Sequence, residues 1–78
     1  MENKKIKNFD RIILTVNLPK EGLTVGDVGV VVDTYEGGKV FEVEFMTLDG
    51  SNTIAVVTLE STQIRAIPAR MLMHARAF

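Results

Sequence analysis

The chain has 78 residues, a formal net charge of −1 and no cysteine. A single domain near this length buries only about 60% of the surface that its unfolded chain exposes, which leaves no room for both a core and a deep active-site cleft. The missing thiols exclude a disulfide scaffold and a thiolate metal site, and the small net charge gives no bulk attraction to a polyanion.

Residues 1–8 form a polar lead-in to the domain. They hold three lysines and two asparagines around one isoleucine, and no apolar stretch of the kind found in secretory signals follows them. No apolar run elsewhere approaches the ~20 residues that a membrane helix needs. We therefore expect a cytoplasmic protein with no membrane partner.

After the lead-in, alternating apolar residues predict a series of short strands. Phe9 stands at a core-like position, and Ile12, Leu14 and Val16 then share one face of the first strand. Residues with turn propensity separate each strand from the next. The predicted strands cover residues 10–16, 28–35, 40–45, 53–59 and 63–67, with a single 3₁₀ turn before the last.

The glycines between the first two strands raise the question of a phosphate-binding loop. Gly22, Gly26 and Gly29 do not follow either phosphate-binding pattern, and a run of valines comes after them where such loops need a helix. We interpret Gly26 as part of a turn, and Gly29 as a site where neighbouring atoms crowd the strand, with a bulge in the valine run. Leu23 and Val25 predict that the loop folds back onto the barrel.

The third strand has the cleanest alternation in the chain. Phe41, Val43 and Phe45 share one face, which we expect to be buried. Glu42 and Glu44 share the other face, which we expect to be exposed, as in an antiparallel sheet with one wet side.

The order of the elements predicts the fold. A long loop follows the first strand, and the Asp49–Gly50 pair predicts a tight hairpin after the third. In the fourth strand, Ile54 or Val57 is expected to reach the core. This layout predicts an all-β protein, a small five-stranded SH3-like barrel over residues 9–67.

The C-terminal tail, residues 68–78, has high helix propensity. Met71, Leu72, Met73 and Phe78 make it too apolar for a free tail, and methionine adapts to irregular surfaces. Two interpretations stay open. The tail caps one end of the barrel, or it serves self-association or partner binding.

The stretch from Phe9 to Arg65 resembles a family of small, stand-alone bacterial proteins, common in cyanobacteria, that is known as a domain of unknown function. The shared pattern is a Phe-Asp-Arg start, LP-x-x-GL, GD-x-G-x-VV, Y-x-x-G, VEF, DG and a closing pair, here Ile64–Arg65. The resemblance implies an SH3-like barrel and no established activity. It also implies a neighbouring small gene in some members, as in toxin–antitoxin or immunity pairs.

No group of side chains predicts catalysis. Nucleophilic catalysis needs a nucleophile, a base and an orienting group, and the one histidine, His74, lies in the tail. Glu42 and Glu44 stand on a wet strand face, where a pair of carboxylates more often keeps the face soluble and discourages edge pairing. The turn at Asp49 lacks the twelve-residue ligand series of a calcium loop. We expect no enzyme activity, no cofactor and no metal.

Binding to RNA or another nucleic acid is the alternative function, because SH3-like barrels often serve it. It requires clustered basic residues beside exposed aromatic side chains. Lys4, Lys5 and Lys7 cluster in the lead-in, but Tyr35 is the only aromatic residue with a polar group. The acidic third strand makes nucleic acid an unfavourable partner.

Protein binding is the function that remains. The loop at residues 17–27 and the turn at residues 35–39 are expected on neighbouring rims, where they present an acidic surface with one tyrosine. Such charge steers the encounter with a basic partner, and a tyrosine anchor supplies affinity. The alternative is that the carboxylates only keep the barrel soluble. The predicted partner-binding residues are Tyr35, Asp33, Glu36, Glu42, Glu44 and Glu21.

Overall fold

The computed structural model describes residues 5–47 and 49–68. Its elements are β1 (Arg11–Leu14), the 3₁₀ turn η1 (Pro19–Glu21), β2 (Val28–Tyr35), β3 (Val40–Met46), β4 (Thr53–Glu60), the 3₁₀ turn η2 (Ser61–Gln63) and β5 (Ile64–Ala66). The five predicted strands and the 3₁₀ turn before the last are confirmed. The predicted helical tail lies outside the described residues, apart from Pro68.

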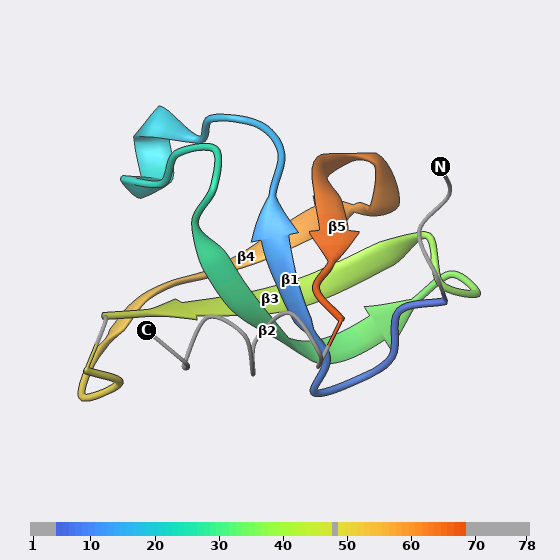
Figure 1. Cartoon of the computed structure of the whole chain (residues 1–78). Coiled ribbons are helices and arrows are strands. Elements are labelled where there is room, and N and C mark those ends of the chain that lie inside the picture. Colours follow the sequence, from blue (N-terminus) through green and yellow to red (C-terminus); the bar gives the residue numbers. More distant parts are fainter. Residues whose placement is uncertain (1–4, 48, 69–78) are drawn as a thin grey trace.

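The strands form one antiparallel sheet in the order β4-β3-β2-β1-β5, with the last strand beside the first (Figure 1). The all-β, five-stranded prediction is therefore confirmed. Within the described part of the chain no ladder joins β4 to β5, so the barrel is open along that seam.

The core lies on the inner face of this sheet. Phe41, Val43 and Phe45 from β3 are buried, as the alternation predicted, and Ile12 and Leu14 from β1 pack with them. The other buried members of the cluster are Ile6, Leu23, Val31, Leu59 and Ile64. Almost every core residue thus comes from a strand, and the loop after β1 contributes one.

The chain enters β1 differently from the prediction. Phe9 is 78% exposed, whereas Ile6 in the lead-in is buried. A turn explains this, because the Asp10 N–H donates to the Lys7 carbonyl and Phe9 adopts a positive φ of 74°. The Phe9 N–H still donates to the Val31 carbonyl at 2.7 Å, so its backbone is fixed to β2 while its ring faces solvent.

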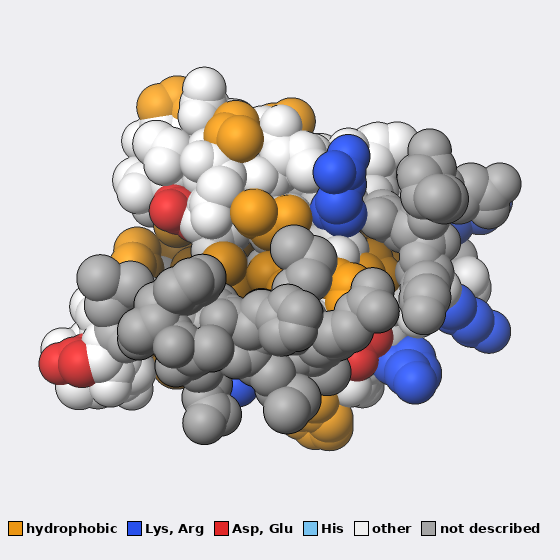
Figure 2. Space-filling model, in the orientation of Figure 1, with side chains coloured by type: hydrophobic (Ala, Val, Ile, Leu, Met, Phe, Trp, Pro, Cys, Tyr) orange, Lys and Arg blue, Asp and Glu red, His pale blue; other side chains and the backbone are white. Residues whose placement is uncertain are grey.

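The loop between β1 and β2 folds back through Leu23. This side chain is buried, and its backbone forms a bridge with Leu18 on either side of η1. Gly22 ends the turn at a φ of 71°, a conformation that glycine adopts without strain. Val25, which was expected to fold back as well, is 56% exposed, and hydrophobic side chains are visible over this loop at the top of Figure 2.

The hairpin between β3 and β4 is the predicted Asp49–Gly50 turn. Gly50 has a φ of 73°, and the Asp49 carboxylate accepts from the Ser51 N–H at 3.0 Å and from the Thr47 hydroxyl at 2.7 Å. These bonds, the one from the Ser51 N–H most of all, lower the pKa of Asp49 to about 2. The carboxylate therefore acts as a structural group of the turn.

Candidate functional site

Four polar residues gather on the outer face of β2 and β3. Asp33 pairs directly with Glu42 across the two strands, Tyr35 lies two residues further along β2, and Glu44 lies two residues from Glu42 on β3. We call Asp33, Tyr35, Glu42 and Glu44 the acidic strip. The structure thus brings together four of the six predicted partner-binding residues.

A bulge in β2 creates the acidic strip. Gly29 and Val31 face the core, so strict alternation would place residues 33 and 35 inward as well. Instead, Val31 pairs with Val43 and the next pair joins Asp33 to Glu42. Val32 therefore has no partner in β3 and is the extra residue of the bulge. The bulge predicted in the valine run is confirmed, and it turns Asp33 and Tyr35 to the outer face.

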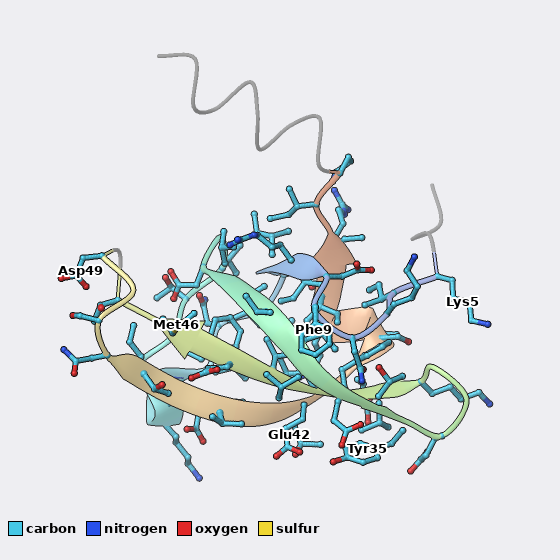
Figure 3. The ribbon with its side chains drawn as sticks, turned by 90° about the horizontal axis from the view of Figure 1, so that it is seen from below. Lys5, Phe9, Tyr35, Glu42, Met46 and Asp49 are labelled. Atoms are coloured by element: carbon cyan, nitrogen blue, oxygen red, sulfur yellow. The ribbon has the colours of Figure 1, made fainter. Side chains whose placement is uncertain are left out.

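Tyr35 and Glu42 are joined by a hydrogen bond. The Tyr35 hydroxyl donates to Oε1 of Glu42 at 2.9 Å, and Figure 3 shows both side chains pointing away from the core. This bond is the main cause that raises the pKa of Tyr35 to about 12, and Asp33 adds to the effect. The Tyr35 ring is thereby held beside Glu42, and its hydroxyl stays neutral and donates the hydrogen bond.

The carboxylates of β3 are less exposed than predicted. Glu42 and Glu44 are half-buried, because neighbouring side chains lie against them. Tyr35 covers Glu42, and the Thr53 hydroxyl of β4 donates to Oε2 of Glu44. Both carboxylates therefore have fixed positions on the sheet.

The remaining two predicted residues lie apart from Asp33 and Glu44. Glu36 stands in the turn after β2 with a φ of 53°, next to Tyr35. Glu21 stands in η1, in the loop that precedes β2. The whole of β2 separates this loop from the turn at residues 35–39, so the expectation that the two occupy neighbouring rims is wrong.

Exposed apolar side chains flank the strip, and the sequence did not indicate them as a group. Val28, Met46, Ile54 and Val56 are each between 39% and 51% exposed. Val57 packs against the core, whereas Ile54 does not. The register shift opposite Phe45 and Met46 explains this, since it leaves Ile54 without a partner in β3.

A depression of about 330 Å³ lies between β4 and the loop that carries η1. Its lining residues are Asn17, Leu18, Pro19, Lys20, Glu21, Val57, Thr58, Leu59 and Gln63. Within residues 5–47 and 49–68, no three His, Cys, Asp or Glu side chains are grouped so that they could hold a metal ion. His74 and Lys4 lie outside these residues.

The sequence pattern of a family described as Domain of unknown function (DUF4926) matches residues 8–66. The chain belongs to the DUF4926 family. The match covers every strand of this DUF4926 domain, from the entry into β1 to the end of β5. No curated protein and no solved structure matches the chain. No helix among the described residues is long and apolar enough to cross a membrane.

Proposed function

We propose that this DUF4926 domain is a non-enzymatic protein-binding domain whose acidic strip receives a basic surface of a partner. The charge of the outer face carries the proposal. Strands β2, β3 and β4 contain no lysine or arginine, and their charged residues are Asp33, Glu42, Glu44 and Glu60. The part of the outer face formed by these three strands therefore carries charge of a single sign, and Arg11 of β1 lies beyond it, on the other side of Val30. Charge of one sign attracts its opposite and raises the rate of encounter.

The surroundings of the strip also suit a protein partner. Protein interfaces have an apolar centre with a polar rim, and tyrosine is enriched among their energetically dominant residues. Tyr35 is 42% exposed at one end of the strip, and Val28, Met46 and Val56 expose apolar surface near the other. A partner could therefore contact carboxylates, an aromatic ring and aliphatic side chains on one sheet face.

The narrower form of the proposal concerns the partner. The resemblance noted in the sequence favours an accessory or antidote protein that acts on the product of a neighbouring gene, as in toxin–antitoxin or immunity pairs. A cytoplasmic location fits a chain without cysteine. Binding of RNA has less support, because strands β2, β3 and β4 offer no basic side chain to a phosphate.

The test begins with the full-length protein as bait in an extract of its native host, followed by affinity measurement with the purified partner. Two variants carry the same charge change. Glu42→Lys alters the acidic strip, and Glu21→Lys alters η1. We expect Glu42→Lys to weaken binding at least about tenfold and Glu21→Lys to change it by less than about twofold.

Tyr35→Ala tests the aromatic anchor in the same assay. Circular dichroism confirms that each variant is folded before its affinity is compared with the wild type. If Tyr35→Ala and Glu42→Lys both bind the partner at full strength, the acidic strip is not the binding site.

A further inference from the structure

The edge of the sheet formed by β4 is long and lacks a neighbouring strand. Among the described residues, β4 pairs only with β3, so one side of this eight-residue strand is free (Figure 1). The other edge, β5, has three residues and is followed closely by Pro68. Only β4 therefore offers a long template to another strand.

Beyond its first residues, β4 carries none of the features that protect such an edge. Proteins discourage pairing of edge strands with lysine, proline, inward charges or bulges. The strand TIAVVTLE contains no lysine, arginine or proline, and its one charge, Glu60, is its last residue. The register shift lies near its first residues, so residues 55–60 pair regularly with β3. Most of the strand is regularly paired, uncharged and rich in β-branched residues.

The backbone groups on the free side can be assigned from the ladder. The Ser61 N–H donates to the Lys39 carbonyl at 2.9 Å, which continues the register of β3 and β4. Hydrogen-bonded and non-hydrogen-bonded pairs alternate in an antiparallel ladder. The N–H and C=O groups of Val56 and Thr58 therefore point away from β3, toward the free side, whereas the Glu60 N–H donates to Oε1 of Gln63 at 2.8 Å.

Space is available beside this edge. The depression of about 330 Å³ is lined by Val57, Thr58 and Leu59 on one side and by the η1 loop on the other. On the outer face, Ile54 and Val56 are 50% and 51% exposed. A strand laid along β4 would cover apolar surface as well as pair its backbone.

We propose that β4 pairs with β4 of a second copy of this chain, antiparallel and across a two-fold axis beside Val56 and Val57. One continuous sheet then runs through both copies. The pairing satisfies the free backbone groups of both edges at once and leaves only the short β5 edges, so the assembly closes at a dimer.

The strand is complementary to itself in this orientation. Its only charge is at one end, so an antiparallel two-fold arrangement holds the two Glu60 carboxylates at opposite ends of the interface. Uncharged β-branched residues then meet around the axis, where cross-strand pairs of this type are stabilising. A parallel arrangement would place the two Glu60 side chains side by side, which is unfavourable.

Sedimentation equilibrium of the full chain across micromolar concentrations tests the proposal. We expect a species of about twice the chain mass of 8.6 kDa. Val56→Lys puts two ammonium groups near the axis and should raise the dimer dissociation constant at least about tenfold. Val28→Lys is the matched control, because Val28 is 46% exposed on the same face but lies in a central strand. It should leave the dimer intact.

Hydrogen exchange supplies a second readout on the same proteins. The amides of Val56 and Thr58 should be protected in the wild type and exchange quickly in Val56→Lys, while the Val57 amide, bonded to β3, stays protected in both. A wild type that is monomeric at every concentration overturns the proposal, and protected edge amides in that monomer would mean that the chain covers its own edge. A dimer that survives Val56→Lys overturns it as well.

Discussion

At the scale of single residues, one hydrogen bond ties the only tyrosine of the chain to the acidic strip. Tyr35 donates to Glu42, which requires a neutral phenol. Ionisation would remove the donor and place a third negative charge beside Asp33 and Glu42. These effects raise the pKa of Tyr35 from its ordinary 10.0 to about 12.

The titration of Tyr35 can be followed directly, because the chain has one tyrosine and no tryptophan. Absorbance of the phenolate should reach its midpoint near the raised pKa of about 12 in the wild type. Glu42→Gln should lower the midpoint toward 10.0, the ordinary value. Glu44→Gln is the control, since Glu44 bonds to Thr53, and it should leave the midpoint unchanged.

The raised pKa of Tyr35 also determines how the stability of the fold changes with pH. A group whose pKa is higher in the folded chain stabilises the fold below its unfolded pKa and loses that contribution as pH rises through the folded pKa. The contribution of Tyr35 is therefore complete below pH 10.0 and is lost as pH rises toward about 12. Equal midpoints in the wild type and Glu42→Gln would contradict the assignment to Glu42.

Two phenylalanines test how burial decides stability. Phe45→Ala removes a ring that is 1% exposed and should cost about 3–5 kcal/mol of unfolding free energy, close to the whole stability of so small a domain. Phe9→Ala removes a ring that is 78% exposed and should cost less than about 0.5 kcal/mol. Urea denaturation measures both, and similar losses would contradict the placement of Phe9.

At the scale of elements, β2 packs against β3 at Gly29 with no room for a side chain. A Cβ atom added there would lie 2.6 Å from Cγ1 of Val43 and 2.9 Å from Cε2 of Phe45. Gly29→Ala should therefore destabilise the domain by about 1–3 kcal/mol through overpacking. Thermal unfolding measures the loss of stability. A Gly29→Ala variant as stable as the wild type would show that the Val43 and Phe45 side chains can move aside without destabilising the domain.

The bulge in β2 sets which face the next residues occupy. Deletion of Val32 would put Asp33 directly after Val31, so the pairs Val31–Val43 and Asp33–Glu42 would form without a bulge and Asp33 and Tyr35 would stay on the outer face. We expect the deletion variant to fold, with a circular dichroism spectrum like that of the wild type. Val32→Ala keeps the residue count and should cost no more than about 1 kcal/mol, since Val32 is 37% exposed. An unfolded deletion variant would show that the domain needs the bend that the bulge gives to β2.

At the scale of the whole molecule, charge is unevenly distributed although the net charge is −1. Strands β2, β3 and β4 are acidic without basic residues, whereas lysines gather in the lead-in, where Lys5 and Lys7 are exposed. A protein partner and a nucleic acid would therefore approach different regions. The affinity of the whole protein for nucleic acid therefore tests whether this distribution of charge governs binding.

Short RNA and DNA should bind weakly at physiological salt, with dissociation constants above about 10 µM in a fluorescence anisotropy titration. The acidic sheet repels phosphates, and the lead-in alone supplies few contacts. Sub-micromolar binding that falls steeply with added salt would contradict this expectation. The variant Lys5→Glu, Lys7→Glu would then show whether the lead-in is responsible.

The sequence by itself determined the strands, their turns and most of the core. Alternation in β3 and the Asp49–Gly50 turn are local patterns, because a side chain's face and a glycine's positive φ depend on nearby residues alone. Local pattern could also place Gly29 in a crowded strand. It could not place Phe9, whose ring direction depends on a turn that is fixed by a backbone bond to β2.

Only the tertiary structure decided which residues share a surface. Asp33 and Tyr35 join Glu42 because a bulge reverses their face, and the register that reveals the bulge exists only once β2 pairs with β3. Glu21 stands apart because the whole of β2 lies between its loop and the turn. The free edge of β4 likewise follows from the strand order, since a strand's neighbours are set by contacts between residues far apart in the chain.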